Sequence, residues 1–314
     1  MQPEMTPAIA DQTPWPCGFF DISGIQADRV EYYNPGLVEQ AGARWLVLRR
    51  VTNSLKPGIP AVSDFVVSKL NGLELEPELH IELLKQHHGQ QYEDPRVIAN
   101  QDNIYLGYTT CVRCKGEVNS WGHSSLAVLD HHWRLVFTHE PDYGGNQPNW
   151  LRNTRCEKNW VWFFHEDKLW FVYRAEPHTV VQFSNYRFMP KEFITRTKLG
   201  WQYGEVRGGT PPIRVGDEYW TMFHSSVGTL HPKVYYMGAY AFSANPPFHV
   251  TRITRQPLLS GNGRDNLIPG RSWVIFPCGA LLQNGEWLVT LGMNDRAAWI
   301  KIPHSELVKL TRPV

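Results

Sequence analysis

Five stretches of this chain repeat one pattern, in which a turn and a polar residue precede a short run of aromatic and aliphatic residues. These stretches are 43–48, 103–108, 168–173, 218–223 and 286–291. Their central residues are Leu46, Tyr105, Trp170, Trp220 and Trp287, which lie 59, 65, 50 and 67 residues apart. Each stretch predicts a strand, and repeats of this length built from short strands favour a radial array of sheets. We therefore predict an all-β chain that folds as one five-bladed β-propeller.

A polar, turn-forming cluster lies about ten to twelve residues before the centre of each predicted strand. The clusters are 33–36, 93–96, 157–160, 207–211 and 276–279. If each cluster opens the innermost strand of its blade, all five face the central channel at one end. The ends of the repeated strands add Arg49, Arg50, Arg174, His224 and Asp295 to the same region. The pattern thus predicts a polar, cation-rich active site at the axial mouth.

The last predicted blade, 274–303, is one strand short. The N-terminal segment 18–22 can supply that strand and close the ring, which removes exposed sheet edges. We expect residues 1–16 to form a flexible tail and residues 17–314 to form the catalytic propeller. Two segments rich in Gly, Asn and Arg, 141–156 and 256–273, are expected to be long loops that shape the site.

Composition narrows the classes of function. The 314 residues carry a formal charge of +1, which argues against a nucleic-acid or membrane surface. No run of 18 apolar residues and no secretory signal pattern occurs, so we expect a cytoplasmic protein. The pair Cys111 and Cys114 is either half of a zinc site or two cysteines of a β-turn. Because no second such pair exists, we expect no metal and no cofactor apart from inorganic phosphate as a co-substrate.

A dense set of cations occupies the middle of the chain: Arg152, Arg155, Lys158, Arg174, His178, Arg207 and His224. They are either solvated surface residues or part of an anion site. Arg174 and His224 favour the second interpretation, since each ends its repeated strand at the same register. Such a site suits phosphate or the diphosphate of a nucleotide sugar.

Several motifs together resemble one known family. They are Asn34-Pro35, Glu93-Asp94-Pro95-Arg96, Lys158-Asn159 followed by Tyr173-Arg174, and Gly209-Thr210-Pro211-Pro212-Ile213 followed by Phe223-His224. In this order they are similar to the motifs of the five-bladed-propeller β-mannoside phosphorylases and their hydrolase relatives. The resemblance runs over most of the chain.

The resemblance implies an inverting glycosyl transfer on β-mannoside-like oligosaccharides or sugar phosphates. Asp94 would be the general acid, protonating the glycosidic oxygen through the 3-hydroxyl of the sugar, and phosphate would be the nucleophile. The substrate would be bound by Asn34, Arg49, Arg50, Glu93, Arg96, Asn159, Thr210 and Asp295. Phosphate would be bound by Lys158, Arg174, His178, Arg207 and His224.

Two departures from the family pattern keep other functions open. Glu205 stands where family phosphorylases tend to carry Lys, and a carboxylate repels phosphate unless Arg207, Arg152 or Arg155 compensates. Glu205 could instead be the base of an inverting hydrolase. The pair Tyr173-Arg174 also lacks the usual His.

Three alternatives follow: a glycoside hydrolase, a nucleotide-sugar-dependent glycosyltransferase on the same scaffold, and a non-enzymatic sugar-binding propeller. An acidic group beside clustered cations favours an enzyme over a binding protein. A cytoplasmic location favours phosphorolysis over hydrolysis, because phosphorolysis keeps the energy of the glycosidic bond inside the cell as a sugar phosphate. A homo-oligomer is left open.

Overall fold

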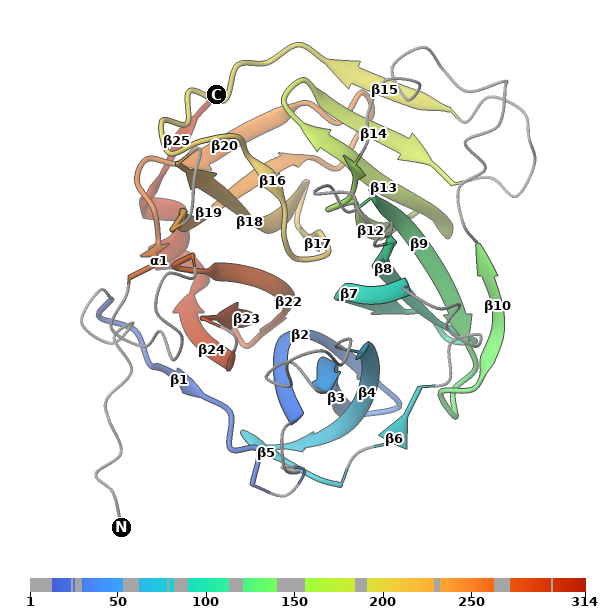
Figure 1. Ribbon diagram of the computed structural model, residues 1–314. Helices are drawn as coiled ribbons and strands as arrows, with labels where there is room; N and C mark the ends of the chain where they lie inside the picture. The colour runs from blue at the N-terminus through green and yellow to red at the C-terminus, as the bar shows by residue number, and fades with distance from the viewer. Residues whose placement is uncertain are drawn as a thin grey trace.

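The computed structural model describes residues 13–23, 25, 30–52, 62–77, 79–81, 90–112, 121–139, 156–183, 191–228, 232–262, 272–294 and 296–314. Within these ranges the strands form five separate sheets around a central axis (Figure 1). The prediction of an all-β, propeller-like chain is confirmed. Apart from strands, the described residues contain one short helix, and no helix among them is long and apolar enough to cross a membrane.

We number the sheets along the chain. Sheet one contains β2 (Val30–Gln40), β3 (Ala43–Thr52), β4 (Val62–Asn71), β5 (Glu74–Leu75) and β6 (Leu79–His80). Sheet two contains β7 (Gln90–Ala99), β8 (Ile104–Val112), β9 (Trp121–Leu129), β10 (Leu135–His139) and β11 (Cys156–Glu157). Sheet three contains β12 (Val161–His165), β13 (Lys168–Ala175), β14 (His178–Gln182) and β15 (Glu192–Thr195).

Sheets four and five complete the ring. Sheet four contains β16 (Arg207–Gly208), β17 (Ile213–Val215), β18 (Glu218–Val227), β19 (Val234–Ser243), β20 (Val250–Thr254), β21 (Leu259–Ser260) and β25 (Thr311–Pro313). Sheet five contains β1 (Cys17–Phe19), β22 (Ile275–Gln283), β23 (Glu286–Met293) and β24 (Arg296–Pro303), and β24 leads into α1 (His304–Lys309). The five repeated stretches are β3, β8, β13, β18 and β23, so the strand prediction is confirmed.

Tight turns connect the inner strands to the repeated strands. Between β22 and β23 the turn is Asn284-Gly285, with φ of 51° and 77°. Between β2 and β3 it is Ala41-Gly42, with φ of 50° and 73°. Two successive residues with positive φ form the hairpin turn whose twist matches that of the flanking strands. Each inner strand is therefore paired at once with the strand that follows it.

The inner strands β2, β7 and β22 contact one another around the axis, and β12 and β17 complete the circle (Figure 1). Three of the polar clusters, 33–36, 93–96 and 276–279, lie inside β2, β7 and β22, whereas the sequence predicted that they open these strands. The other two, 157–160 and 207–211, precede β12 and β17, as predicted. Asn34, for example, is the fifth of the eleven residues of β2. The clusters nevertheless face the axis, as the spacing indicated.

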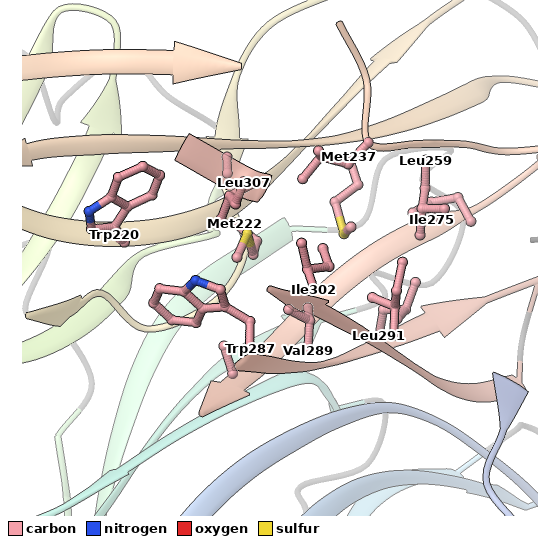
Figure 2. Close-up of a cluster of buried hydrophobic side chains, with 14 of the residues drawn as sticks. Trp220, Met222, Met237, Leu259, Ile275, Trp287, Val289, Leu291, Ile302 and Leu307 are labelled. Carbon is pink, nitrogen blue, oxygen red and sulfur yellow. The ribbon is translucent and has the colours of Figure 1, made fainter. Parts of the chain in front are cut away.

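Hydrophobic clusters fill the spaces between neighbouring sheets. Between sheets four and five, Trp220 and Met222 of β18 meet Trp287 and Val289 of β23 (Figure 2). Leu307 of α1 closes the outer side of this cluster and is fully buried. Burial of each such side chain contributes about 1.5–3 kcal/mol, so sheet-to-sheet packing is a main source of stability.

The ring is closed by its two ends in sequence. β1 pairs antiparallel with β24, with Phe19 opposite Ala298, so the prediction of an N-terminal closing strand is confirmed. Order begins before residue 17, because Trp15 packs against the cluster of sheets four and five and the carbonyl of Pro16 accepts a hydrogen bond from Lys301 N at 2.8 Å. Trp15 and Pro16, which were expected to belong to the tail, therefore contact the propeller. Residues 1–12 and much of the two predicted long loops, 141–155 and 263–271, lie outside the described residues.

Candidate active site around the axis

Inner strands β2 and β7 each contain an extra residue that breaks their register with the next strand. The breaks fall on Asn34-Pro35 and Asp94-Pro95. Asn34 and Asp94 have φ of 50° and 57°, and Asn159, just before β12, has φ of 69°. Asn and Asp tolerate this left-handed conformation, and Pro, which cannot donate to a ladder, is suited to a bulge. Because bulges redirect side chains, sheets one and two turn Asn34 and Asp94 toward the axis in the same way.

The carboxyl group of Asp94 is held by Asn34 of the neighbouring sheet. Nδ2 of Asn34 donates a hydrogen bond to Oδ1 of Asp94 at 2.9 Å. Asp94 is 5% exposed and Asn34 is 8% exposed. The structure thus brings together the predicted acid and one of its predicted neighbours across 60 residues of sequence.

The buried side chain of Arg96 joins sheet two to sheets three and four. Its Nε donates to the carbonyl of Gly209 at 2.7 Å, and its Nη2 donates to the carbonyl of Gly208 at 3.1 Å. Nη2 also donates to Oδ1 of Asn159 at 3.3 Å, while Nη1 donates to the backbone carbonyl of Asp94 at 3.1 Å. Arg96 is 2% exposed. We therefore assign it the role of a tie between inner strands, in place of the predicted contact with substrate.

An ion pair crosses from sheet one to sheet two. Nη2 of Arg49 lies 2.7 Å from Oε1 of Glu93, and its Nε donates to Oγ of Ser63 at 2.8 Å. Burial alone would raise the pKa of Glu93, but the charges of Arg49 and Lys158 outweigh it and lower that pKa. Glu93 is therefore ionised near neutral pH, next to the protonated guanidinium of Arg49.

Three of the five predicted anion ligands, Lys158, Arg207 and His224, meet on the side of sheets three and four. Lys158 is exposed, and its charge lowers the pKa of both Glu93 and His224, so it lies within electrostatic reach of both residues. His224 is 1% exposed, with its ring 4.3 Å from that of Phe276. Burial, and then the charges of Arg96, Arg207 and Lys158, hold the pKa of His224 well below its usual range. His224 is consequently a neutral imidazole near pH 7, so it adds no positive charge to an anion site.

Glu205 and Arg207 form the exposed edge of this group. Nε of Arg207 lies 3.4 Å from Oε2 of Glu205, and the two side chains are 31% and 68% exposed. Arg207 pairs directly with His224 across β16 and β18. An exposed ion pair of this kind is weak, so Arg207 can exchange Glu205 for another anion at little cost.

A match between this sequence and a protein-family model decides the family to which the chain belongs. The model described as β-1,4-mannooligosaccharide phosphorylase matches residues 149–313, which is more than half of the chain. The chain belongs to glycoside hydrolase family 130. It is therefore an enzyme of glycosyl transfer, and the resemblance found in the sequence is confirmed. A search of curated proteins finds no match.

Solved structures of family 130 and related enzymes share the fold of this chain. The β-1,2-mannobiose phosphorylase from Listeria innocua has 14% sequence identity and a TM-score of 0.64, covering 94% of this chain and 98% of that chain. The mannose phosphorylase MPT-4 from Leishmania mexicana, in complex with phosphate ion, has 13% identity and a TM-score of 0.60, covering 97% and 93%. A structure from work on GH130 hydrolases that target β-1,2 mannosidic linkages in Candida mannan has 13% identity and a TM-score of 0.67, covering 93% and 96%. At these identities the likeness shows the fold alone.

Not every predicted site residue of this family 130 member reaches the axial group. Arg50 lies on the other face of β3 from Arg49 and forms a two-point ion pair with Asp64, at 2.9 Å for each contact. Arg174 is exposed, with its guanidinium 5.7 Å from the ring of Tyr173. Among the described residues, the cations that act on His224 do not include Arg174.

Two further predicted ligands serve packing instead. His178 is 1% exposed and its ring lies 4.9 Å from that of Phe242, between sheets three and four, so it cannot reach a phosphate ion. Oγ1 of Thr210 accepts a hydrogen bond from Met222 N at 2.9 Å and fastens β18. We therefore leave both out of the proposed site. Asp295 lies outside the described residues.

The thiols of Cys111 and Cys278 were not assigned to the site from the sequence, although both lie within electrostatic reach of its carboxyl groups. Burial raises the pKa of Cys111, and the nearby charge of Glu93 adds to this effect. Burial also raises the pKa of Cys278, which lies within electrostatic reach of Arg96 and Asp94. Both are therefore neutral thiols that exclude water. The position of Cys278 in the fifth polar cluster was a signal that could have identified it.

Proposed function

We propose that this enzyme catalyses the inverting phosphorolysis of β-linked mannosides at the axial mouth of its five sheets, within the single domain 17–314. The observation that carries the proposal is the buried carboxyl group of Asp94, fixed by Asn34 at 2.9 Å in a group that also contains Lys158, Arg207 and His224. An acid and an anion site close together are the two elements that this reaction requires. Membership of family 130 supports the same chemistry.

Each proposed role follows from the charge that the residue carries. An oxygen of phosphate forms a bond to the anomeric carbon while the glycosidic C–O bond breaks and leaves its electron pair on the departing oxygen. The proton of Asp94 reaches that oxygen through the 3-hydroxyl of the sugar, as the family resemblance implies. Lys158 and Arg207 balance the charge of phosphate, and the neutral His224 packs behind them. The products are a sugar 1-phosphate of inverted configuration and a shortened saccharide.

The sugar that undergoes transfer is proposed to lie against sheets one and two. Arg49 and Glu93 form an ion pair there, with side chains 13% and 20% exposed. Such a pair can donate to one sugar hydroxyl and accept from another, which orients the ring without a net charge. Asp295 remains a proposed ligand of a sugar hydroxyl.

Hydrolysis is the second candidate, and one observation favours it. Glu205 is 68% exposed and lies 3.4 Å from Arg207, where it opposes the binding of phosphate and could activate water instead. One of the solved structures with a similar fold comes from work on hydrolases of family 130. The cytoplasmic location, the lack of a cofactor other than phosphate and the oligomeric state also remain proposals.

The deciding experiment is a screen of β-linked mannobioses with and without phosphate, in which free mannose and mannose 1-phosphate are measured separately. Mannose 1-phosphate that forms only with phosphate supports the proposal. Free mannose released at a rate independent of phosphate contradicts it and makes Glu205 the candidate base. If neither product forms, both candidate reactions are wrong.

Asp94→Asn tests the acid. We expect its kcat on mannobiose to fall by at least about a hundredfold, because general acid catalysis contributes on the order of 10²–10⁴. Asp167→Asn is a matched control, since Asp167 has φ of 58° against 57° for Asp94 but lies exposed in the turn between β12 and β13. Turnover of Asp94→Asn equal to that of the control would show that Asp94 is not the acid.

A further inference from the structure

Asn34 and Asp94 form a matched pair on neighbouring inner strands. Both stand at the register break of their strand, both have left-handed backbones and both precede Pro. Their side chains meet through a hydrogen bond of 2.9 Å that is buried from solvent. Of the described residues, Asn34 is the one that donates a hydrogen bond to the carboxyl group of Asp94.

Asn34 is itself held from behind by sheet five. A Cβ atom at Gly292 of β23 would lie 1.8 Å from Oδ1 of Asn34 and 3.3 Å from its backbone N. Any side chain at this position would displace the amide. The backbone of Gly292 therefore forms a wall that keeps the amide of Asn34 directed at Asp94. Sheet one is also fixed from this side, because Oγ1 of Thr290 donates to the carbonyl of Pro35 at 2.6 Å.

We infer that Asn34 is a positioning residue for the proposed acid, and that Gly292, Asn34 and Asp94 form a relay of contacts across sheets five, one and two. This inference rests on the proposed function of Asp94 and goes beyond the predicted role of Asn34 as a sugar ligand. It assigns to Asn34 an effect that passes through the carboxyl group.

The chemistry of the two carboxyl oxygens explains why such a residue is useful. An amide N–H can donate only to an oxygen that accepts, so Oδ1 is fixed as the carbonyl-like oxygen of the protonated acid. Oδ2 is then the oxygen that carries the proton and releases it toward the leaving group. A carboxyl group free to rotate would offer the proton in this direction for only part of the time, which lowers the rate of protonation without weakening sugar binding.

Asn34→Gly removes the amide without backbone strain, because glycine adopts positive φ readily. We expect kcat on mannobiose to fall by about tenfold or more, with KM within about twofold of the wild-type value. On a dinitrophenyl β-mannoside, whose leaving group departs without a proton, we expect kcat within about twofold of wild type. Asn284→Gly is the matched control, since Asn284 has φ of 51° in the exposed turn between β22 and β23, and it should leave both rates unchanged.

Gly292→Ala tests the wall independently. Its Cβ atom must displace the amide of Asn34, so it should reproduce the dependence on leaving group that Asn34→Gly shows. If Gly292→Ala does not fold, the Asn34→Gly result alone decides. An equal loss on both substrates overturns the inference, since it indicates a direct sugar contact or a structural role, and so does the absence of any loss on mannobiose.

Failure of the inference differs from failure of the proposed function. If wild type is active and Asp94→Asn is inactive on mannobiose while Asn34→Gly loses activity equally on both substrates, only the inference is wrong. If wild type turns over no mannoside, or if Asp94→Asn retains activity, the proposed function and the positioning role are both wrong. A double-mutant cycle of Asn34→Gly with Asp94→Gly, followed by urea unfolding, tests the contact itself: additive changes show that the two side chains do not interact.

Discussion

At the scale of single residues, His178 shows what burial does to a titratable group. Its ring is 1% exposed, and its centroid lies 5.7 Å from that of Tyr240. Burial lowers the pKa of His178 to about 4 from an ordinary value of 6.5. When the pH falls below 6.5, His178 takes up a proton in the unfolded chain, whereas in the folded chain it does so only when the pH approaches 4. The free energy of unfolding must therefore fall as the pH drops through this window, by about 3 kcal/mol in total.

Replacing His178 removes this proton uptake. We expect the wild-type protein to lose about 2 kcal/mol more stability than His178→Phe between about pH 7 and about pH 5. Urea unfolding of both proteins at the two pH values measures the difference. His132→Gln, in the exposed turn after β9, is the control and should behave as wild type. A pH dependence of His178→Phe identical to that of wild type would show that His178 titrates normally.

At the scale of elements, the approach of β22 to β2 depends on one glycine. A Cβ atom at Gly279 would lie 2.2 Å from the backbone N of Leu37 and 2.7 Å from Oγ1 of Thr290. Backbone cannot move aside as a flexible side chain can. The two inner strands can therefore approach this closely only because this position lacks a side chain.

Gly279→Ala should separate β22 from β2. We expect a loss of about 3 kcal/mol in the free energy of unfolding, as is usual for severe overpacking. The control is Gly216→Ala, where no atom lies within 4 Å of the added Cβ but φ is +60°. That variant should cost only about 1 kcal/mol, through backbone strain. In urea unfolding, the midpoint of Gly279→Ala should therefore lie below that of Gly216→Ala. The reverse order would contradict the close contact between β22 and β2.

The same elements show what the sequence could predict. The repeated strands could be predicted because each copy places a run of aromatic and aliphatic residues after a turn and a polar residue. The axial position of Asn34, Asp94 and Lys158 followed from their constant spacing before those strands. The bulges could not be read from the pattern, although a shift of one residue moves a side chain to the other face of a sheet.

Arg174 and His224 illustrate that limit. The pairing of β13 with β14 shifts register between Val172 and Arg174, whereas β18 pairs with β19 without a shift beyond His224. The two residues therefore end in different surroundings, although their sequence positions match. The surroundings of His178 could not be predicted either, since Tyr240 and Phe242, which pack against it, belong to β19 of another sheet.

At the scale of the whole molecule, closure depends on the short strand β1. Trp15 precedes it, Phe19 ends it, and the ring of Phe19 lies under the guanidinium of Arg296 at 3.5 Å. A Cβ atom at Gly18 would lie 3.3 Å from the ring of Trp299, so β1 fits closely against β24. These contacts hold β1 at the edge of sheet five and against the cluster between sheets four and five.

Trp15→Ala combined with Phe19→Ala should loosen the ring. We expect the thermal midpoint to fall by about 5 °C or more, because partly buried aromatic side chains are lost at the closing strand. Turnover should also be lost at a lower temperature than in the wild-type protein, since the site requires sheets one, two and five to keep their relative positions. Val136→Ala removes an exposed apolar side chain and is the control. A double variant that unfolds with the control would show that β1 is dispensable.

The closing strand also bears on how the molecule is made. β1 leaves the ribosome long before its partner residues 298–300 are synthesised. Domains tend to fold from their N-terminal end during synthesis, which adds about 5–20 residues per second, so β1 stays unpaired while the strands from β2 to β23 are made. Asn34 and Asp94 can meet early, yet Gly292 arrives only when sheet five is made. A ribosome that stops before sheet five therefore releases a chain with an open ring and an unsupported acid, which makes the completed ring a checkpoint for activity during translation.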